Sequence, residues 1–294
     1  MKKSDVIVIG GSAAGLTAAL TCRRNYPEKK VLVIRQEKQV LVPCGIPYIF
    51  GTFGSPEKNL IPDAMLEKNG IDLLVDEVID IDRTGRIVTT ANGEKIGFEK
   101  LVIGTGSTPA HPGIPGIDLK NVFLVKKDVS YLNQMLEQLN VSSNMVIVGG
   151  GFIGAEFADE CRKNRQMKIT IVEMLEHCMM LSLGDEFGIV AEKIAKDHGI
   201  DILAPEKVEA FTGEQKVEKV KLASGKELKA DIVLIGIGSV SNTGLAEKAG
   251  LKLGPTKSIQ VNRYMQTSDE NIFACGDCAE KVSFFDGQPS NLML

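Results

Sequence analysis

An aliphatic run that feeds a glycine-rich turn occurs twice in this sequence, and this repeat limits the possible folds more than any other pattern. The first copy spans residues 5 to 20, DVIVIGGSAAGLTAAL, and the second spans residues 145 to 164, MVIVGGGFIGAEFADECRKN. Each run has the composition of a strand that is buried on both faces of a parallel sheet. Because glycine carries no side chain, the turn lets backbone N–H groups and the positive end of the next helix approach a pyrophosphate. Each copy therefore predicts a β-α-β unit that binds a dinucleotide.

The second copy has the full G-x-G-x-x-G spacing, through Gly149, Gly151 and Gly154. A single turn of this kind is weak evidence, since any loop that needs positive φ gives a similar pattern. Here both copies also return to a strand, VLVIR at residues 31 to 35 and ITIVE at residues 169 to 173. A chain with two such units most often passes electrons between two bound cofactors.

The composition is that of an ordinary globular protein and excludes some partners. The 294 residues suffice for two domains, each with its own core. The chain carries 34 Lys and Arg residues against 38 Asp and Glu residues, a net charge of −4, which gives no electrostatic basis for binding nucleic acid. No apolar run reaches the roughly 18 residues that a membrane span requires. Because Met1–Lys3 leads directly into a strand, without the apolar core of a signal peptide, we expect a soluble cytoplasmic protein.

Between and after the two repeats, the pattern predicts smaller elements. Residues 71 to 90 and 201 to 230 alternate aliphatic and polar positions between turn signals, which indicates two small antiparallel meanders. A helix is expected at about residues 127 to 139. The stretch at 101 to 116 begins as a buried strand and continues as the tract richest in Pro and Gly, so it predicts a crossing between domains.

The six cysteines are too few and too scattered for a secreted disulfide framework. Cys44 differs from the others because it lies between Pro43 and Gly45, just after the first repeat has completed its second strand. In a doubly wound fold that position is on the cofactor side, beyond the carboxyl ends of the strands. If a helix begins near Gly45, its dipole would lower the pKa of the thiol. The alternative is a small apolar residue in a turn, and the residues alone leave both interpretations open.

Cys275 and Cys278 form a C-x-x-C pair, which is typical of a redox dithiol or of half a zinc site. No second C-x-x-C or paired histidines complete a set of ligands, because His111, His177 and His198 are far apart in the sequence. We therefore predict no metal site and interpret both cysteines as incidental.

The order of four motifs resembles that of the flavoprotein pyridine nucleotide-disulfide oxidoreductases, over nearly the whole chain. These motifs are the first glycine turn, GTGSTP at 104 to 109, the second glycine turn and ACGDCA at 274 to 279. The lone Cys44, followed by Gly-Ile-Pro-Tyr, resembles the single-cysteine branch of NADH oxidases, NADH peroxidases, coenzyme A disulfide reductases and persulfide reductases. The resemblance implies an α/β fold with two Rossmann-like three-layer domains, in which the NADH-binding domain is inserted in the FAD-binding domain and each carries a small meander.

The same resemblance assigns domains, cofactors and site residues. It implies a FAD-binding domain at residues 1–115, an NADH-binding domain at 116–240 and a FAD-binding return segment at 241–294. Residues expected to bind FAD are Gly10, Gly11, Ser12, Ala13, Ala14, Gly15, Arg35, Glu37, Val78, Thr105, Gly106 and Asp277. Residues expected to bind NADH are Gly149, Gly151, Phe152, Ile153, Gly154, Glu156, Glu173 and Gly238. Cys44 is the expected catalytic residue.

Glu173 also indicates which nucleotide the second site prefers. It lies 19 residues after Gly154, where a carboxylate can accept a hydrogen bond from the adenosine ribose 2′-hydroxyl and repel a 2′-phosphate. NADH is therefore expected in preference to NADPH.

The sequence departs from the family pattern at three places. Ser12 stands for the second glycine of the first turn, which the family tolerates. Arg35 replaces the acidic residue expected near the end of the strand VLVIR, which leaves Glu37 as a substitute and a 2′-phosphate partner for Arg35 as the minor interpretation. Family members also continue into a third domain that builds the dimer interface, whereas this sequence stops at Leu294. A homodimer is expected of a full-length relative and is not carried over to this chain.

These observations predict an oxidoreductase that passes hydride from NADH through FAD to an acceptor at Cys44. A disulfide, coenzyme A disulfide, persulfide or polysulfide ranks slightly above oxygen or peroxide, which would be reduced through a Cys44 sulfenic acid in an NADH oxidase or peroxidase. Arg23 and Arg24 are candidates to meet an anionic thiol carrier such as coenzyme A, or form only a solvated basic helix end. A flavin reductase of a protein electron carrier and a nonenzymatic nucleotide-binding fragment are the remaining alternatives.

Overall fold

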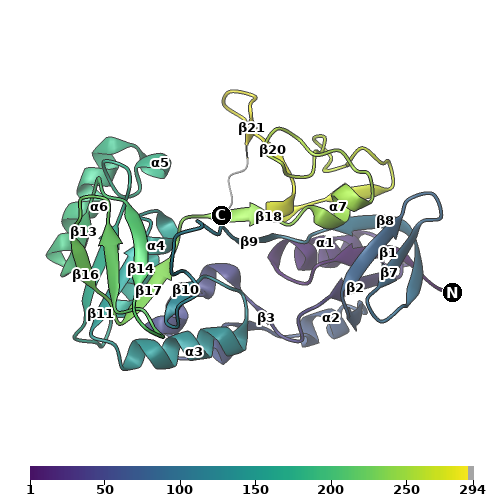
Figure 1. Cartoon of the computed structure of the whole chain (residues 1–294). Helices are drawn as coiled ribbons and strands as arrows, with labels where there is room; N and C mark the ends of the chain where they lie inside the picture. The colour runs from purple at the N-terminus through teal and green to yellow at the C-terminus, as the bar shows by residue number, and fades with distance from the viewer. Residues whose placement is uncertain (291–294) are drawn as a thin grey trace. The chain divides into compact units, whose positions relative to one another are not determined.

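The computed structural model describes residues 1–290, and the chain divides into two compact units. Unit 1 comprises Met1–Pro43, Leu60–Thr108 and the segment from Ser239 onward, whereas unit 2 comprises Cys44–Asn59 and Pro109–Gly238. Each unit contains its own parallel sheet, so the predicted α/β class with two dinucleotide-type domains is confirmed (Figure 1). Unit 2 includes the segment around Cys44, which the expected division at residues 115 and 240 did not separate from the first domain.

Unit 1 is built on a parallel sheet with an antiparallel extension. Its strands follow the order β5-β2-β1-β8-β7-β6, and β19 also pairs with β8. The parallel strands are β1 (Lys2–Ile9), β2 (Val31–Arg35), β5 (Asp72–Val75), β8 (Lys95–Ile103) and β19 (Ile272–Ala274). The antiparallel strands are β6 (Val78–Asp82) and β7 (Ile87–Thr90), which continue from β8. The meander expected at residues 71 to 90 is therefore wrong in its first part, because β5 pairs in parallel with β2 on the other side of the sheet.

Shorter elements complete unit 1. The helices are α1 (Ala13–Asn25), α2 (Ala64–Lys68), α7 (Gly244–Lys248) and the 3-10 turn η4 (Gly276–Cys278). The short strands are β3 (Val40–Leu41), β4 (Leu60–Ile61), β9 (Ser107–Pro109), β18 (Ser239–Ser241), β20 (Lys281–Val282) and β21 (Pro289–Ser290). Aliphatic side chains of the parallel strands form the core, and Ile7, Leu101 and Ile272 are fully buried.

Unit 2 repeats the parallel arrangement. Its five-stranded sheet has the order β10-β17-β11-β12-β13. These strands are β10 (Val122–Leu124), β11 (Asn144–Val148), β12 (Lys168–Val172), β13 (Ile200–Leu203) and β17 (Ile232–Ile235). An antiparallel meander contains β14 (Val208–Thr212), β15 (Lys219–Leu222) and β16 (Glu227–Lys229). The second meander was predicted to begin at residue 201, but β13 belongs to the parallel sheet.

Helices and turns of unit 2 connect these strands. The helices are α3 (Val129–Asn140), α4 (Phe152–Arg162), α5 (Met180–Leu183) and α6 (Asp185–Asp197), and the 3-10 turns are η1 (Pro43–Gly45), η2 (Pro47–Phe50) and η3 (Pro56–Asn59). The helix predicted at about residues 127 to 139 is confirmed as α3. It begins at Val129, and the carboxylate of the preceding residue, Asp128, caps the helix by accepting from the N–H of Tyr131 at 2.7 Å.

The strand orders explain where the glycine turns lie. In both sheets the first strand of the repeat, β1 or β11, has the second strand of the repeat on one side and a later parallel strand on the other. Parallel strands end at the same edge of a sheet, so each glycine turn lies beside the residues that follow the two neighbouring strands. Within residues 1–290, no helix combines the length and the apolar character needed to cross a bilayer.

Candidate dinucleotide and thiol sites

The first glycine turn is held against the strand beside it by contacts that exclude side chains. Gly10 has φ of +107°, and a Cβ atom there would lie 2.1 Å from the carbonyl oxygen of Gly104. A Cβ atom at Gly15 would lie 2.0 Å from the carbonyl oxygen of Gly10. Only glycine therefore lets the first turn of α1 (Ala13–Asn25) pack directly on the end of β1 (Lys2–Ile9).

The second glycine turn repeats these contacts one for one. Gly149 has φ of +104°, and a Cβ atom there would lie 2.6 Å from the carbonyl oxygen of Gly236. A Cβ atom at Gly154 would lie 2.0 Å from the carbonyl oxygen of Gly149. At Gly151, in contrast, no atom lies within 4 Å of such a Cβ, so this side of the turn is open. An open backbone surface at the N-terminus of α4 fits the approach of a pyrophosphate.

In unit 1 the structure brings the other residues expected to bind a cofactor to the same edge of the sheet. The hydroxyl of Ser107 donates to Oδ2 of Asp277 at 2.8 Å, and a Cβ atom at Gly276 would lie 2.7 Å from Cβ of Ala14. The first glycine turn, the segment from Gly104 to Ser107 and the turn at Gly276–Cys278 therefore form one cluster. The cluster is a candidate dinucleotide site of unit 1.

Asn242 also supports this cluster, although no sequence motif predicted it. Its side-chain amide donates to the carbonyl oxygen of Thr105 at 2.9 Å, and its backbone carbonyl accepts from the hydroxyl of Thr105 at 2.7 Å. Its backbone N–H donates to the carbonyl oxygen of Gly106 at 2.9 Å. These bonds link residues separated by more than 130 positions in the sequence, which a local motif does not reveal.

The structure argues against a 2′-phosphate partner for Arg35. Its side chain is buried, and its guanidinium forms a bidentate ion pair with Asp63 at 2.8 Å. It also donates to the carbonyl oxygens of Glu37 and Lys38 at 2.9 and 3.1 Å. Four of the five guanidinium N–H donors are thereby used, so little capacity is left for a phosphate. A Cβ atom at Gly11 would lie 2.4 Å from Cδ of Arg35, so the arginine stem packs beneath the first glycine turn.

The other two residues predicted near this end of unit 1 lie in different environments. The side chain of Glu37 is exposed. Val78 begins β6 just after β5 (Asp72–Val75), and its side chain is buried in the core. Only the backbone of Val78 is therefore available to a ligand.

Glu173 occupies in unit 2 the place that Arg35 has in unit 1. Its carboxylate is buried and accepts from the N–H of Gly150 at 2.6 Å and from the N–H of Leu175 at 2.8 Å. Both interactions hold an acceptor beside the second glycine turn. This geometry fits a residue that discriminates between ribose hydroxyl and phosphate groups.

The remaining residues predicted in unit 2 surround the same turn. A Cβ atom at Gly236 would lie 3.3 Å from Cγ2 of Ile153, and Gly238 is exposed with φ of +100°. Phe152, at the first position of α4 (Phe152–Arg162), is 49% exposed. Desolvation, together with the nearby charge of Glu160, raises the pKa of Glu156 above its usual value.

Cys44 is the exposed cysteine among the six. It lies in η1 (Pro43–Gly45), which is followed by the four-residue turn η2 (Pro47–Phe50). Two short 3-10 turns therefore stand where the sequence suggested that a helix begins near Gly45. They are too short to provide the helix dipole that was expected to act on the thiol.

The other thiols are shielded from solvent in different degrees. Burial raises the pKa of Cys161 and of Cys178 to about 12 and that of Cys275 to about 11. Cys278 is buried, and its Sγ donates to the carbonyl oxygens of Ile103 and Cys275 at 3.4 and 3.2 Å. Burial also raises the pKa of the half-buried Cys22.

The C-x-x-C pair thus has the environment of packed thiols. Cys275 and Cys278 are both free thiols, and the second points to backbone carbonyls. Across the residues that the structure describes, no three His, Cys, Asp or Glu side chains are grouped as metal ligands.

Arg23 and Arg24 differ in what they contact. Arg23 donates to the carbonyl oxygens of Asn69 and Lys29 at 3.0 and 3.1 Å and also to that of Pro27, so it is engaged at the end of α1 (Ala13–Asn25). Both arginines line an open hollow of about 690 Å³ together with Lys68. The basic lining of this hollow is compatible with an anionic thiol carrier such as coenzyme A.

A match to a known profile decides to which family the chain belongs. Residues 4–292 match the profile of the pyridine nucleotide-disulphide oxidoreductases. The chain belongs to this family. The predicted resemblance is confirmed at the level of the family, and with it the assignment to the oxidoreductases.

Several members of the pyridine nucleotide-disulphide oxidoreductase family resemble the chain over nearly its full length. It is 36% identical to the NAD(P)H coenzyme A polysulfide/persulfide reductase of Pyrococcus horikoshii, over 97% of this chain and 65% of that protein. It is 33% identical to the NADH oxidase of Methanocaldococcus jannaschii, over 96% of this chain and 64% of that protein. A solved NAD-dependent persulfide reductase from A. fulgidus matches 99% of this chain and 56% of its own, with a TM-score of 0.92 and 32% identity. The chain thus spans slightly less than two thirds of the curated relatives.

Proposed function

We propose that this protein is an NADH-dependent FAD flavoprotein that reduces a small sulfur compound at Cys44. The observation that carries the proposal is the exposed thiol of Cys44, in a chain whose other cysteines are packed or shielded and whose two glycine turns fit dinucleotides. Relatives named as persulfide and polysulfide reductases support a sulfur acceptor over other compounds.

In this proposal each unit holds one cofactor. Unit 1 holds FAD at the cluster of Gly10, Thr105 and Asp277, and unit 2 holds NADH at the turn of Gly149 and Gly151. When bound, the flavin accepts hydride from NADH and provides the electrons for the acceptor. The glycine turns bind the pyrophosphates through backbone N–H groups at the N-termini of α1 and α4, and the side of the second turn at Gly151 is open to this approach.

The chain itself provides the nucleophile. The thiolate of Cys44 attacks one sulfur atom of a disulfide, forms a mixed disulfide and releases the other sulfur as a thiolate. With a persulfide or polysulfide, the same attack transfers one sulfur to Cys44 and releases the shortened thiolate. Two electrons, supplied by NADH, then cleave the S–S bond at Cys44, which returns Cys44 to the thiolate and releases the bound half of the substrate as a thiol, or as hydrogen sulfide when one sulfur had been transferred.

A Cys44→Ser variant tests this function. We expect it to bind FAD and NADH with affinities within about twofold of the wild type, because the serine is isosteric and lies on the surface. Reduction of an aromatic disulfide such as DTNB, or of polysulfide, should fall at least a hundredfold, since a hydroxyl does not replace a thiolate at sulfur. The matched control is Cys22→Ser, which should retain the reduction. Unchanged reduction in Cys44→Ser would contradict the proposal.

A second candidate function is reduction of oxygen or peroxide through a Cys44 sulfenic acid. The 33% identity to an NADH oxidase favours it. The two functions are distinguished by trapping the wild-type protein with dimedone during aerobic NADH consumption. Labelling of Cys44 at the rate of oxygen consumption supports the oxidase, whereas the absence of a label while polysulfide is reduced supports the sulfur reductase.

A further inference from the structure

The segment that carries Cys44 is built into unit 2 by its contact with α4 (Phe152–Arg162). The rings of Phe50 and Phe157 are both fully buried, with their centroids 5.2 Å apart. A Cβ atom at Gly51 would lie 2.3 Å from the carbonyl oxygen of Glu160. The backbone of the segment therefore lies directly against the last turn of the helix.

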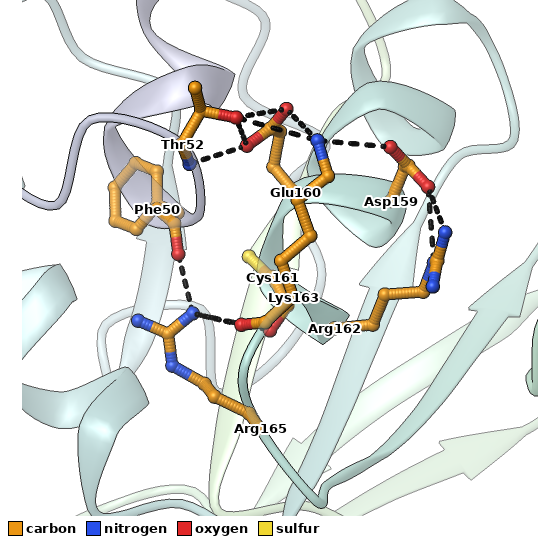
Figure 2. Close-up of polar contacts among 8 residues, drawn as sticks. All are labelled: Phe50, Thr52, Asp159, Glu160, Cys161, Arg162, Lys163 and Arg165. Atoms are coloured by element: carbon orange, nitrogen blue, oxygen red, sulfur yellow. Dashed lines mark hydrogen bonds and ion pairs between the residues drawn. The ribbon is translucent and has the colours of Figure 1, made fainter.

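A buried carboxylate holds the two together. Glu160 is 3% exposed, and its carboxylate accepts from the backbone N–H of Thr52 at 2.8 Å and from the hydroxyl of Thr52 at 2.9 Å. Lys163 adds an ion pair at 2.6 Å. Figure 2 shows these bonds converging on one carboxylate. A buried charge requires such compensation, so Glu160 and Thr52 hold each other in place.

A second bond from the helix end reaches the same segment. The guanidinium of Arg165 donates to the carbonyl oxygen of Phe50, as Figure 2 shows, and to the carbonyl oxygen of Cys161. The residues from Phe50 to Thr52 are thereby fixed through a ring contact, a carboxylate and a guanidinium.

Two short turns connect these fixed residues to Cys44. The N–H of Gly51 donates to the carbonyl oxygen of Tyr48, and the N–H of Ile49 donates to that of Ile46 at 3.1 Å. Ile46 and Ile49 are buried. A Cβ atom at Gly45 would lie 2.0 Å from Oδ1 of Asn59, so the residue after Cys44 is also in close contact. A shift at Thr52 therefore reaches the thiol through packed residues.

We propose that Glu160 is a positioning residue for Cys44. The proposal rests on the proposed function, because it requires Cys44 to be the reacting thiol. Helix α4 begins with the glycine turn at Gly151 and reaches Glu160 before it ends, so one rigid element relates the nucleotide turn to the cysteine segment. Gln at this position keeps the size of Glu, but it has one acceptor oxygen in place of two and no charge to compensate Lys163.

The test compares Glu160→Gln with Asp159→Asn and with Glu160→Asp. Asp159 is the neighbouring carboxylate, it is half exposed, and it pairs with Arg162 at 2.7 Å and with Lys163 at 3.6 Å, whereas the bonds to Thr52 come from Glu160. The Asp159→Asn variant is therefore a matched control that removes a carboxylate beside Lys163 and keeps the bonds to Thr52. In Glu160→Gln we expect amide hydrogen exchange of Thr52 to become at least tenfold faster and iodoacetamide to alkylate Cys44 at least threefold faster. The dissociation constant for NADH should stay within twofold, and so should reduction of ferricyanide, which needs no thiol. The turnover number with DTNB should fall at least tenfold, and Glu160→Asp should recover part of it.

Equal alkylation of Cys44 and equal DTNB turnover in Glu160→Gln and in Asp159→Asn would overturn the proposal. If Glu160→Gln does not fold, Thr52→Val and Thr52→Ser replace it. Valine removes the hydroxyl and serine keeps it, so faster alkylation in the valine variant alone supports the proposal, and equal rates overturn it. Failure of this proposal is distinguishable from failure of the proposed function, because the proposed function is contradicted by a different result, namely that Cys44→Ser still reduces DTNB.

Discussion

Substitution of the last glycine in the second turn tests whether the close packing of α4 (Phe152–Arg162) on its strand depends on the absence of a side chain. In Gly154→Ala the new Cβ would lie 2.0 Å from the carbonyl oxygen of Gly149 and 3.3 Å from Cγ2 of Ile147. An ordinary contact requires about 3.5 Å, so the helix or the turn must move by more than about 1 Å. Overpacking of this kind costs about 1–3 kcal/mol, against a gain of about 1 kcal/mol in helix propensity.

Because the obstructing atom belongs to the backbone, the cost of overpacking lies at the upper end of its range, about 3 kcal/mol, and the gain in helix propensity offsets about 1 kcal/mol of it. We expect unit 2 to lose about 2 kcal/mol of stability, which corresponds to a decrease in Tm of about 4–8 °C. The matched control is Gly151→Ala, where no atom lies within 4 Å of the new Cβ and φ is −74°. Because Gly151 is the N-cap of α4, its substitution by alanine should lower the free energy of unfolding by only about 0.5 kcal/mol. Its methyl group would occupy the open side of the turn, so NADH should bind at least tenfold more weakly.

Thermal unfolding followed by circular dichroism and titration with NADH separate the two variants. We expect a large loss of stability in Gly154→Ala, and a large loss of NADH affinity with little loss of stability in Gly151→Ala. A Tm for Gly154→Ala within 1 °C of the wild type would refute the packing argument. Equal destabilisation by both substitutions would refute the distinction between a packed and an open glycine.

Two further predictions concern the thiols and the buried arginine. At pH 8, iodoacetamide should modify Cys44 well before Cys161 and Cys178, whose pKa of about 12 keeps them as thiols, and mass spectrometry of the native and the unfolded protein measures the order. The pKa of both thiols is higher in the folded state than the ordinary value of 9.0, so the stability they contribute is complete below pH 9 and is lost as the pH rises toward 12. Urea unfolding at several pH values should show this decline, and a free energy of unfolding that is constant over this range would contradict it. Asp63→Asn should lower the free energy of unfolding by roughly 1–3 kcal/mol, because it leaves the guanidinium of Arg35 buried without its charge partner, although exposure of the Asp63 side chain reduces the effect. Urea unfolding measures it, and a change below 0.5 kcal/mol would show that the pair is not a structural ion pair.

The two dinucleotide units could be predicted from the sequence because each depends on a local signal. An aliphatic strand, a glycine turn and a helix follow one another within 20 residues, and the contacts that require glycine, such as that between Gly10 and Gly15, lie inside the same motif. Alternation alone was less reliable at residues 71 to 75 and 201 to 203. A short aliphatic strand reads the same whether it joins a meander or a parallel sheet, since the choice depends on its partners.

Contacts between distant residues left no such signal. The bond between Thr52 and Glu160 joins positions 108 residues apart; Thr52 belongs to no motif, and Glu160 follows the glycine positions of the second copy. Glu160 is also the last carboxylate in the helical run from Glu156 to Glu160, where an exposed, solvated charge is the ordinary expectation. Its burial is decided by the segment that packs against it, and only the folded chain provides that information.

The two copies of the repeat carry side chains of opposite charge at the end of their second strand, and this difference distinguishes the two units. At this place unit 2 has the buried carboxylate of Glu173, which accepts from the N–H of Gly150, whereas unit 1 has the buried guanidinium of Arg35, neutralised by Asp63. A phosphate on the ribose would meet a negative charge in unit 2 and a compensated ion pair in unit 1. Discrimination between a ribose hydroxyl and a phosphate is therefore expected in unit 2, where the proposed function places NADH. In unit 1 the stem of Arg35 packs beneath the first glycine turn and its guanidinium is paired with Asp63, so we expect no such discrimination there.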